Sequence, residues 1–571
     1  MTRRPRRHPH QQRARHTLRA SAWAALAVAA GLGLPAHAAE FEVGDDLKLN
    51  WTNTFRYGLA YRLKDFDAAL AHPNGDDGDR NFKKGLVSNR IELLSELDAV
   101  STRGFGARVS AAGWYDAEYN GKNDNPGFAG GAIPNRTSPA FNEFPKKTRD
   151  LLGRRVEVRD AFVFGKVELG DMPLTARLGQ HALVWGESLF FASNAIAGGQ
   201  SAFDISRLLA DPTAQAKEFV LPVPQLSAQL QVNTSLTLAA YVQFRHRPNR
   251  LPPVGSYFSV SDVVGEGAEQ LFTGPSSSVL REGDLKASHS GQFGLQAKWR
   301  VAETDLGLYA IRFHDKDPQQ VTRLGLVTIP GVPPFVAPTG YYLTWHEATT
   351  AFGLSASRSV GEVNLAAEVS VRRNQSLASS GHAADASALA PPGVVPASDN
   401  RDNPAYAVGN TAHVNVSAIW SLQPSALWRE ALFIGELAWN RLLSCRESCA
   451  ALDPNATRDA VSLRFVFEPT YRQLLPGLDL GVPVGLGWTP KGSRNVIGPF
   501  ATPAEGGGDF TFGLNGTYEQ TWKFNVAYTK FFGDAAPLLD LPANPATPPS
   551  FTYQQSRKDR DFVSVSVRRS F

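Results

Sequence analysis

Apolar and polar residues alternate one by one along many stretches of about ten residues. Residues 363–372, for example, read VNLAAEVSVR, and residues 292–300 read QFGLQAKWR. Successive side chains of a β-strand point to opposite faces, so this period of two predicts strands with one apolar and one polar face. Outside residues 20–34, no stretch approaches the roughly 20 consecutive apolar residues that a transmembrane helix needs. With 43% hydrophobic and 20% charged residues, the chain does not have the composition of a polytopic helical membrane protein.

The spacing of these stretches favours a transmembrane barrel over a soluble β-sandwich, which also alternates. We expect an all-β fold, a transmembrane antiparallel β-barrel of about 18 strands, with 16 as the alternative count. The strands are predicted near residues 46–62, 87–99, 103–118, 155–168, 173–184, 225–232, 235–246, 290–301, 305–315, 347–358, 362–373, 409–421, 429–442, 459–473, 477–488, 509–518, 521–532 and 560–571. Short turns follow most even-numbered strands and long loops follow most odd-numbered ones, as in barrels with short periplasmic turns and long extracellular loops. A closed barrel pairs every backbone polar group within lipid, which an open sheet cannot do.

The N-terminus has the three parts of a secretory signal peptide. Residues 1–19 carry seven arginines and no acidic residue, residues 20–34 are apolar, and Ala36 and Ala38 are small residues at a cleavage site. A membrane anchor is the alternative, but residues 20–34 are short for a span. We expect cleavage near Ala38, so that residues 39–571 form the barrel. The formal charge then changes from +4 to +4 − 7 = −3, which removes the support for nucleic-acid binding.

The C-terminus ends on an aromatic residue. Phe571 shares a predicted strand face with Val563, Val565 and Val567. This pattern resembles the signal that the outer-membrane barrel assembly machinery reads, although Arg569 departs from it. An Arg side chain near the interface can extend toward water, so the departure is small. An ordinary edge strand is the alternative.

Several motifs resemble domain-of-unknown-function family 1302, a family of Gram-negative outer-membrane proteins. The main block is GQHALVWGES at residues 179–188. Similar stretches are NFKKGLVSNR at 81–90, GQFGLQAKWRVAETDLGLYAIRFHDKDP at 291–318, residues 217–218 with 222–224, and GDDLKLNWTNTFRYGLAYR at 44–62. The resemblance implies an outer-membrane barrel that acts as a channel. It also implies uptake or export of hydrophobic compounds alongside inner-membrane export systems.

The polar strand faces are expected to line the barrel interior. The basic residues on these faces are Arg108, Arg159, Arg245, Lys298, Arg300, Arg312, Arg372, Lys523 and Arg568, and the acidic ones include Glu92, Glu96, Glu157, Glu368 and Glu436. A mixed lumen with a basic excess favours anionic solutes, because rings of charge set selectivity. The alternative is that these charges pair across strands and only fill the wall.

The long segment 185–224 is the best candidate for a pore constriction. It is rich in aromatic residues, carries the main family block, and is longer than loops without a function usually are. We expect it to fold inward and narrow a barrel that is otherwise wide enough for an aqueous channel. The candidate constriction or solute-binding residues are Trp185, Glu187, Asp204, Arg207, Lys217 and Glu218. An outer lid packed on neighbouring loops is the alternative.

The other long loops are expected to form solvated surface. Residues 375–406 and 533–556 are rich in Ala, Pro and Ser and are predicted to bury little. The acidic run 72–80 is compatible with Ca²⁺ but lacks the final Glu of an EF-hand, so a solvated acidic loop is favoured. Cys445 and Cys449 lie four apart and are expected to form a local disulfide. A metal site would need two further ligands, and none is predicted.

No enzyme motif occurs in the sequence: GxSxG, HExxH, a Walker motif and CxxC are all absent. We therefore expect a channel for small hydrophobic or anionic solutes, with no cofactor and no catalytic residue. The alternatives are a barrel-anchored surface protein for binding or adhesion, and an outer-membrane lipolytic enzyme. The expected partners are membrane lipid, the assembly machinery, an unidentified solute, and further copies of the chain.

Overall fold

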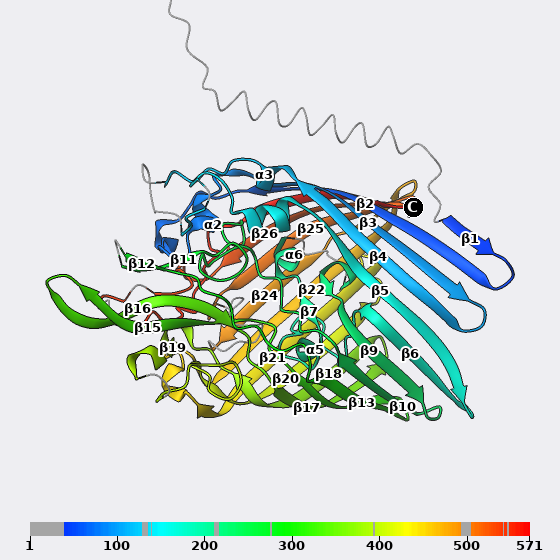
Figure 1. Cartoon of the computed structure of the whole chain (residues 1–571). Coiled ribbons are helices and arrows are strands. Elements are labelled where there is room, and N and C mark those ends of the chain that lie inside the picture. The colour runs from blue at the N-terminus through cyan, green and yellow to red at the C-terminus, as the bar shows by residue number, and fades with distance from the viewer. Residues whose placement is uncertain are drawn as a thin grey trace, which may run out of the picture.

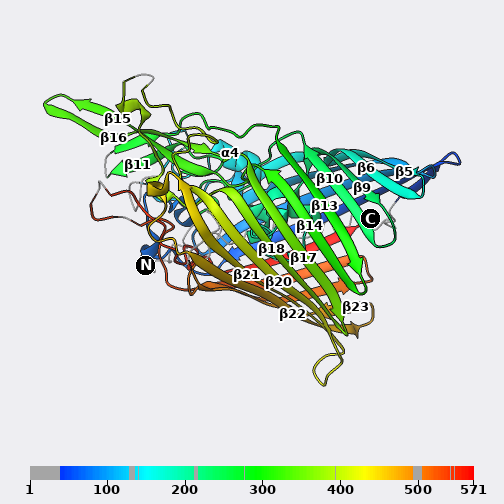
Figure 2. The same ribbon diagram turned by 90° about the horizontal axis from the view of Figure 1, so that it is seen from below.

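The fold is described from a computed structural model, which places residues 39–127, 135–138, 140–210, 216–274, 277–391, 394–492, 504–540, 542–544 and 547–571. The predicted signal peptide, 1–38, lies outside the described residues. The described chain forms a closed antiparallel barrel, which is seen in two orientations in Figures 1 and 2. β2 (Leu47–Arg62) pairs with β3 on one side and with the last strand, β27 (Phe562–Ser570), on the other, which closes the barrel.

The wall contains 18 strand positions. The sheet has 20 strands, but β1 (Ala39–Val43) pairs only with β2, and β23 and β24 share one position between β22 and β25. The remaining wall strands are β3 (Gly85–Ser101), β4 (Phe105–Asp116), β5 (Arg154–Leu169), β6 (Met172–His181), β9 (Val223–Gln231), β10 (Leu236–Gln243), β13 (Gln292–Val301), β14 (Thr304–Phe313), β17 (Thr349–Val360), β18 (Val363–Ser376), β20 (Val408–Leu422), β21 (Glu430–Glu447), β22 (Asp459–Leu475), β23 (Leu478–Gly481), β24 (Val484–Lys491), β25 (Gly508–Tyr518) and β26 (Trp522–Phe532). The predicted fold class and the strand count of 18 are confirmed.

The other elements lie in the connections between wall strands. The strands in these connections are β7 (Ala202–Phe203), β8 (Val220–Leu221), β11 (Gln270–Gly274), β12 (Ser277–Leu280), β15 (Gln319–Ile329), β16 (Val332–Thr344) and β19 (Ala384–Asp385). The helical turns are η1 (Ala68–Leu70), α2 (Asp77–Arg80), α3 (Ala117–Asn120), α4 (Lys146–Thr148), η3 (Arg149–Gly153), α5 (Ala197–Gln200), α6 (Ile205–Ala210), α7 (Ala216–Phe219), η4 (Ser380–His382), η5 (Ser387–Leu389) and η6 (Cys449–Ala451). Within the described residues, no helix is long and apolar enough to cross a membrane.

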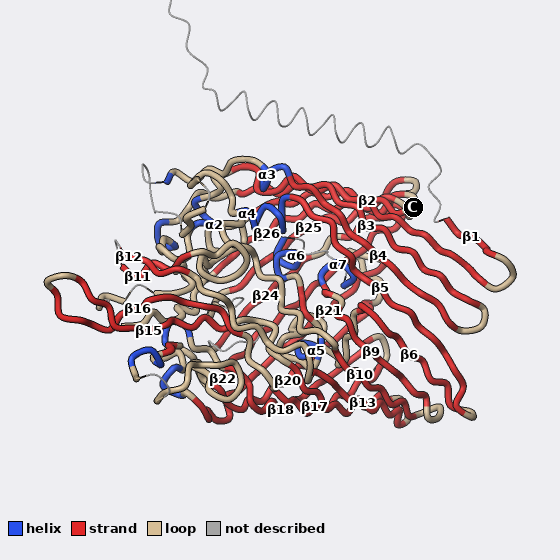
Figure 3. The backbone as a smooth tube through the Cα atoms, viewed as in Figure 1, coloured by secondary structure: helices blue, strands red, loops and turns tan. Residues whose placement is uncertain are grey.

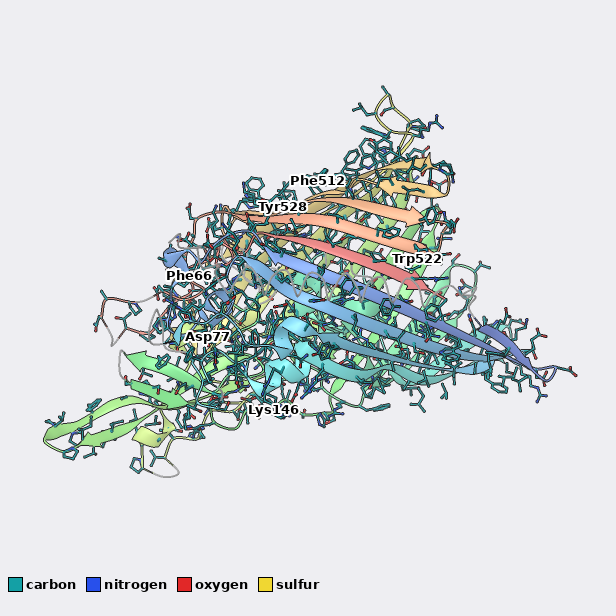
Figure 4. The ribbon with its side chains drawn as sticks, turned by 90° about the horizontal axis from the view of Figure 1, so that it is seen from above. Phe66, Asp77, Lys146, Phe512, Trp522 and Tyr528 are labelled. Carbon is teal, nitrogen blue, oxygen red and sulfur yellow. A yellow bond between two sulfur atoms is a disulfide. The ribbon has the colours of Figure 1, made fainter. Side chains whose placement is uncertain are left out.

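The alternating pattern places apolar side chains outside and polar side chains inside. On β14, Leu308 is 55% exposed whereas its neighbour Tyr309 is 4% exposed and faces inward. Trp522 and Phe512 lie on the outer surface of β26 and β25 (Figure 4). The ring of Trp522 lies under the guanidinium of Arg569 at 4.9 Å, which accounts for an arginine on an otherwise apolar face.

The two ends of the barrel differ as expected. The short turns lie at one end, and Gly361, between β17 and β18, has a φ of +56° that side-chain-bearing residues rarely adopt. The long loops gather at the other end (Figure 1). They meet in an aromatic cluster in which Phe82, Phe144 and Tyr257 come from three different loops.

Several loop predictions are wrong. Ala378 and Tyr406 in the segment 375–406, and Phe551 in 533–556, are buried in hydrophobic clusters rather than solvated. The acidic run is also buried, because Asp79 pairs with Arg560 at 2.7 Å across 481 residues of sequence. The hairpin of β15 and β16 was not expected. These elements depend on contacts between loops, which a period-two pattern does not encode.

Candidate functional site

The described parts of the connection between β6 and β9, residues 182–210 and 216–222, lie inside the barrel and are called the lumen segment here. Figure 3 shows its elements α5, α6 and α7 between the walls. It corresponds to the predicted segment 185–224, although β9 already begins at Val223. Its first half contacts the wall formed by β18, β20 and β21. Its second half contacts the opposite region, formed by β2, β3, β5 and β27.

Two buried carboxylates hold the first half. Glu436 of β21 accepts hydrogen bonds from the backbone N–H groups of Leu189 and Phe191 at 3.0 Å each, and also from Phe190. Glu368 of β18 accepts from the N–H groups of residues 187 and 196, at 2.9 and 2.6 Å. Ionised acceptors make stronger hydrogen bonds than neutral ones. These lumen-facing acids therefore fix the path of the chain.

Polar groups between these carboxylates complete the attachment. Arg372 donates to the carbonyls of Ser193 and Ala195 at 2.9 Å each. The Asn194 amide donates to Asn415 Oδ1 at 2.9 Å, and its Oδ1 contacts His413 at 2.9 Å. Lumen residues of three neighbouring wall strands thus hold a single stretch of the lumen segment.

Trp185 and Glu187 take different positions within the first half. Trp185 is buried, and its ring meets Tyr241 edge-on with the centroids 5.0 Å apart, in a cluster that also contains Tyr309. It therefore packs the segment against the wall. Glu187 is partly exposed, and its carboxylate lies 3.9 Å from Lys298 Nζ. Of the two, Glu187 is the one placed to meet a solute.

The second half is held by ion pairs. Asp204 accepts from the N–H of Arg207 at the start of α6, and its Oδ2 lies 2.8 Å from Arg250 Nη1. Arg207 bridges Glu92 of β3 at 2.8 Å and Glu218 of α7 at 2.6 Å. Glu92 and Arg250 lie far from the other three residues in the sequence, which is why no local motif could join all five.

The last two candidates lie on α7. Lys217 Nζ lies 2.6 Å from Glu96 of β3. Glu218 contacts three guanidinium groups: Arg207 at 2.6 Å, Arg568 of β27 at 2.8 Å and Arg56 of β2 at 3.4 Å. The Glu218 side chain is only 10% exposed, so these guanidinium groups rather than water surround its carboxylate.

A cavity of about 250 Å³ adjoins these ion pairs and is called the basic cavity here. Its charged lining consists of eight cations (Arg56, Arg90, Arg159, Arg207, Lys217, Arg250, Lys523 and Arg568) and four acids (Glu92, Glu157, Asp204 and Glu218). The formal charge is therefore +8 − 4 = +4. Gln520 and Thr521, in the turn between β25 and β26, also line it, so the cavity lies toward the end with the short turns.

The remaining predicted lumen charges differ in their positions. The prediction for Arg312 is wrong, because Arg312 lies opposite the exposed Phe293 while its neighbours on β14 face inward. Arg108 lies 2.9 Å from Asp98 and also pairs with Glu96, while Arg300 lies 2.8 Å from Asp305 beside the β13–β14 turn. These two are paired along the wall, as in the alternative interpretation. Arg245 is exposed and lies beyond β10. Its predicted wall position is wrong, because the ladder ends at Gln243 and the chain turns into a loop.

Two smaller predictions concern the loops. The sulfur atoms of Cys445 and Cys449 are 2.08 Å apart, within bonding distance. Among the described residues, Asp76, Asp77 and Asp262 bring carboxylate oxygens within 4.8 Å of one another. Two of them form ion pairs with arginines. Asp76 lies 3.1 Å from Arg80, and Asp77 lies 3.1 Å from Arg136.

Sequence reasoning missed three cations of the basic cavity: Arg56, Arg90 and Arg250. Arg56 follows Asn50, Thr52 and Thr54 at a spacing of two, so the alternation of β2 could have placed it on the inner face. Arg250 lies in a loop without any period, and only its contacts with Glu157 and Asp204 reveal it.

The chain is similar to several solved outer-membrane structures. OccAB1 of Acinetobacter baumannii is 12% identical, with 92% of this chain and 96% of that chain covered and a TM-score of 0.41. A BenF-like porin from Pseudomonas fluorescens Pf-5 is 12% identical, with 92% and 98% covered and a TM-score of 0.40. Pseudomonas aeruginosa OpdK, solved with vanillate, is 10% identical, with 93% and 99% covered and a TM-score of 0.39.

None of the curated proteins matches this chain significantly. The model of one protein family does match, over residues 19–571, and it is described as "Protein of unknown function (DUF1302)". The match spans nearly the whole sequence, including the motifs at 81–90, 179–188 and 291–318 on which the resemblance was recognised. The chain therefore belongs to the DUF1302 family.

Proposed function

We propose that the protein is a channel for small organic anions in the outer membrane of a Gram-negative bacterium, with its apolar exterior against lipid. The observation that carries this proposal is the basic cavity, whose lining combines eight cations with four acids. Enclosed charges of one sign focus the electric field and raise the local concentration of counter-ions. An excess of four positive charges inside the barrel favours anions over cations.

The lumen segment supports a selective route rather than an open pore. An 18-stranded barrel is wide enough for an aqueous channel unless something fills it. The lumen segment contacts opposite regions of the wall, through Glu436 on one side and Glu218 on the other. A solute must then pass beside the segment, next to the basic cavity that Arg207 and Lys217 line.

The lining also narrows the class of solute. Arginine recognises carboxylates through paired N–H donors, and all six arginines of the basic cavity are already engaged by carboxylates of the chain itself. One aromatic residue, Trp114, lies there too, 4.4 Å from the Arg90 guanidinium. We infer that small carboxylates fit this cavity better than uncharged hydrophobic compounds do.

The test is ion selectivity of the purified full barrel in planar bilayers under a KCl gradient. We expect the sign of the reversal potential to show that chloride permeates more readily than potassium. Lys523→Gln removes a cation on the inner face of β26, so selectivity should shift toward potassium. Lys530→Gln, on the outer face of the same strand, is the matched control and should leave it unchanged. A silent barrel would contradict the proposal and favour a surface anchor, and a barrel that prefers potassium would contradict the selectivity for anions.

A further inference from the structure

We propose that Arg56, Arg207 and Arg568 form a carboxylate-binding site in the lumen, and that Glu218 occupies this site until a solute carboxylate replaces it. The inference rests on the proposed function, because it names the site at which an anion would bind on its way through the channel. The Glu218 side chain then acts as an internal substitute for the solute.

The cations on the wall form a row across three adjacent strands. In the register of the sheet, Arg568 of β27 lies directly opposite Arg56 of β2 on one side and opposite Lys523 of β26 on the other. Like charges directly opposite each other destabilise a sheet. A row of three cations therefore requires an anion, and the wall itself supplies only Glu92, opposite Arg56 at one end of the row.

Glu218 supplies the missing anion from outside the wall. Its Oε1 lies 2.8 Å from Arg568, and its Oε2 lies 2.6 Å from Arg207 and 3.4 Å from Arg56. Both oxygens are thus bound by guanidinium groups. The three arginine side chains are between 12% and 19% exposed, so these charge-assisted bonds form largely out of contact with water, where they are strong.

The site has room for a replacement. The same three arginines line the basic cavity of about 250 Å³, roughly the volume that eight water molecules take up in the liquid. Lys523, at the far end of the row, also lines the cavity, is exposed and has no carboxylate partner within the described residues. A small carboxylate in the cavity would therefore meet a cation before it reaches Arg568.

The element that carries Glu218 depends on its contacts. α7 spans four residues, and a helix this short is not stable by itself in water. It is held by the Glu218 ion pairs, by Lys217 on Glu96, and by Arg159, which donates to the carbonyls of residues 217 and 220. The first half of the lumen segment has separate attachments on Glu368 and Glu436. Replacing Glu218 therefore removes the contacts of α7 with the three arginines and loosens α7 on its two remaining attachments, while the first half of the lumen segment stays in place.

The exchange predicts a response that requires no variant. Benzoate should raise the chloride conductance of the wild-type channel in planar bilayers, because it frees α7 from the arginines. Benzyl alcohol, which has nearly the same shape without the charge, should have no effect. An equal response to both compounds, or none to benzoate, would overturn the exchange. Because this comparison uses only the wild-type protein, it tests the exchange even if a lumen variant does not fold.

Glu218→Gln tests the occupant itself. Without the internal carboxylate, conductance in the absence of benzoate should rise and the further increase with benzoate should disappear. Direct binding of benzoate to the purified variant should be about tenfold tighter than to the wild type, as expected when a competing charge-assisted hydrogen bond is removed. Glu303→Gln removes an acid from the β13–β14 turn, where it pairs with Arg358, and should behave like the wild type.

The outcomes separate the inference from the function. If the wild type is anion-selective and the Glu218→Gln variant responds to benzoate as the wild type does, the internal-substitute role is overturned. The channel proposal would still stand. A wild type that is silent or prefers potassium would overturn the channel proposal and, with it, this inference.

Discussion

At the scale of single residues, the lumen acids act on the backbone of a neighbouring segment. Glu436 is 4% exposed and accepts three consecutive backbone N–H groups of the lumen segment, while its other oxygen accepts from Asn415 at 2.7 Å. A buried carboxylate is stabilised when several donors surround it. The same donors lose their partners when the carboxylate is removed, so one side chain governs the position of a whole loop.

We expect Glu436→Ala to release the first half of the lumen segment. Buried backbone donors left without partners cost about 1–3 kcal/mol, so the free energy of unfolding should fall by this order. Single-channel current should become larger and noisier. Denaturant titration of the refolded barrel and bilayer recording measure the two effects. Glu430→Ala, on the same strand but exposed and paired with Arg472, is the control; equal effects of both variants would refute the role of Glu436.

At the scale of elements, alternation predicted the wall strands because each strand separates lipid from the lumen. One face of the strand must therefore be apolar and the other polar. The hairpin of β15 and β16 escaped this reasoning. β16 contains Pro333, Pro334 and Pro338, and proline weakens a strand signal because it cannot donate to a ladder. The lumen segment has no period at all. Its partner Arg568 is 350 residues from Glu218, a contact that no local pattern encodes.

The long loops contain a pH-sensitive group in Asp76. Burial raises its pKa to about 6, although Arg80 opposes the shift. A carboxyl whose folded pKa is raised stabilises the fold while it is protonated, and this contribution is lost as the pH rises through about 6. Limited proteolysis of the loops should therefore be faster at pH 8 than at pH 5. Asp76→Asn should reduce this difference, and an unchanged pH profile in the variant would exclude Asp76 as its source.

The link between Cys445 and Cys449 should have a small effect on the stability of the barrel. It closes a loop with a sequence separation of 4, and chain entropy limits the gain from so short a loop to about 2 kcal/mol. Replacing both cysteines by serine should lower the free energy of unfolding by no more than this. Mass spectrometry without reduction reports whether the bond forms. A much larger loss of stability would indicate that the loop has another structural role.

At the scale of the whole molecule, closure depends on the two ends of the chain. β27 meets β2 from the pair Arg62–Phe562 to the pair Thr54–Ser570. Phe571 continues this ladder, since its N–H and carbonyl exchange hydrogen bonds with Asn53 at 2.8 and 2.7 Å. Thr54 and Ser570 lie 516 residues apart in the sequence, so contacts of very long sequence separation close the barrel. Such contacts are slow to form and leave edges exposed meanwhile.

The side chain and the backbone of Phe571 should have separable roles. Phe571→Ala keeps both hydrogen bonds to Asn53, so the purified variant should refold in detergent with nearly wild-type stability. If the assembly machinery reads the terminal aromatic ring, the same variant should accumulate several-fold less folded barrel in the outer membrane. Heat-modifiable gel mobility of membrane fractions measures this amount. Deleting Phe571 should impair both processes, because it also removes the backbone pair. Normal accumulation of Phe571→Ala would show that the ring is not part of the assembly signal and that the ladder alone accounts for the terminal residue.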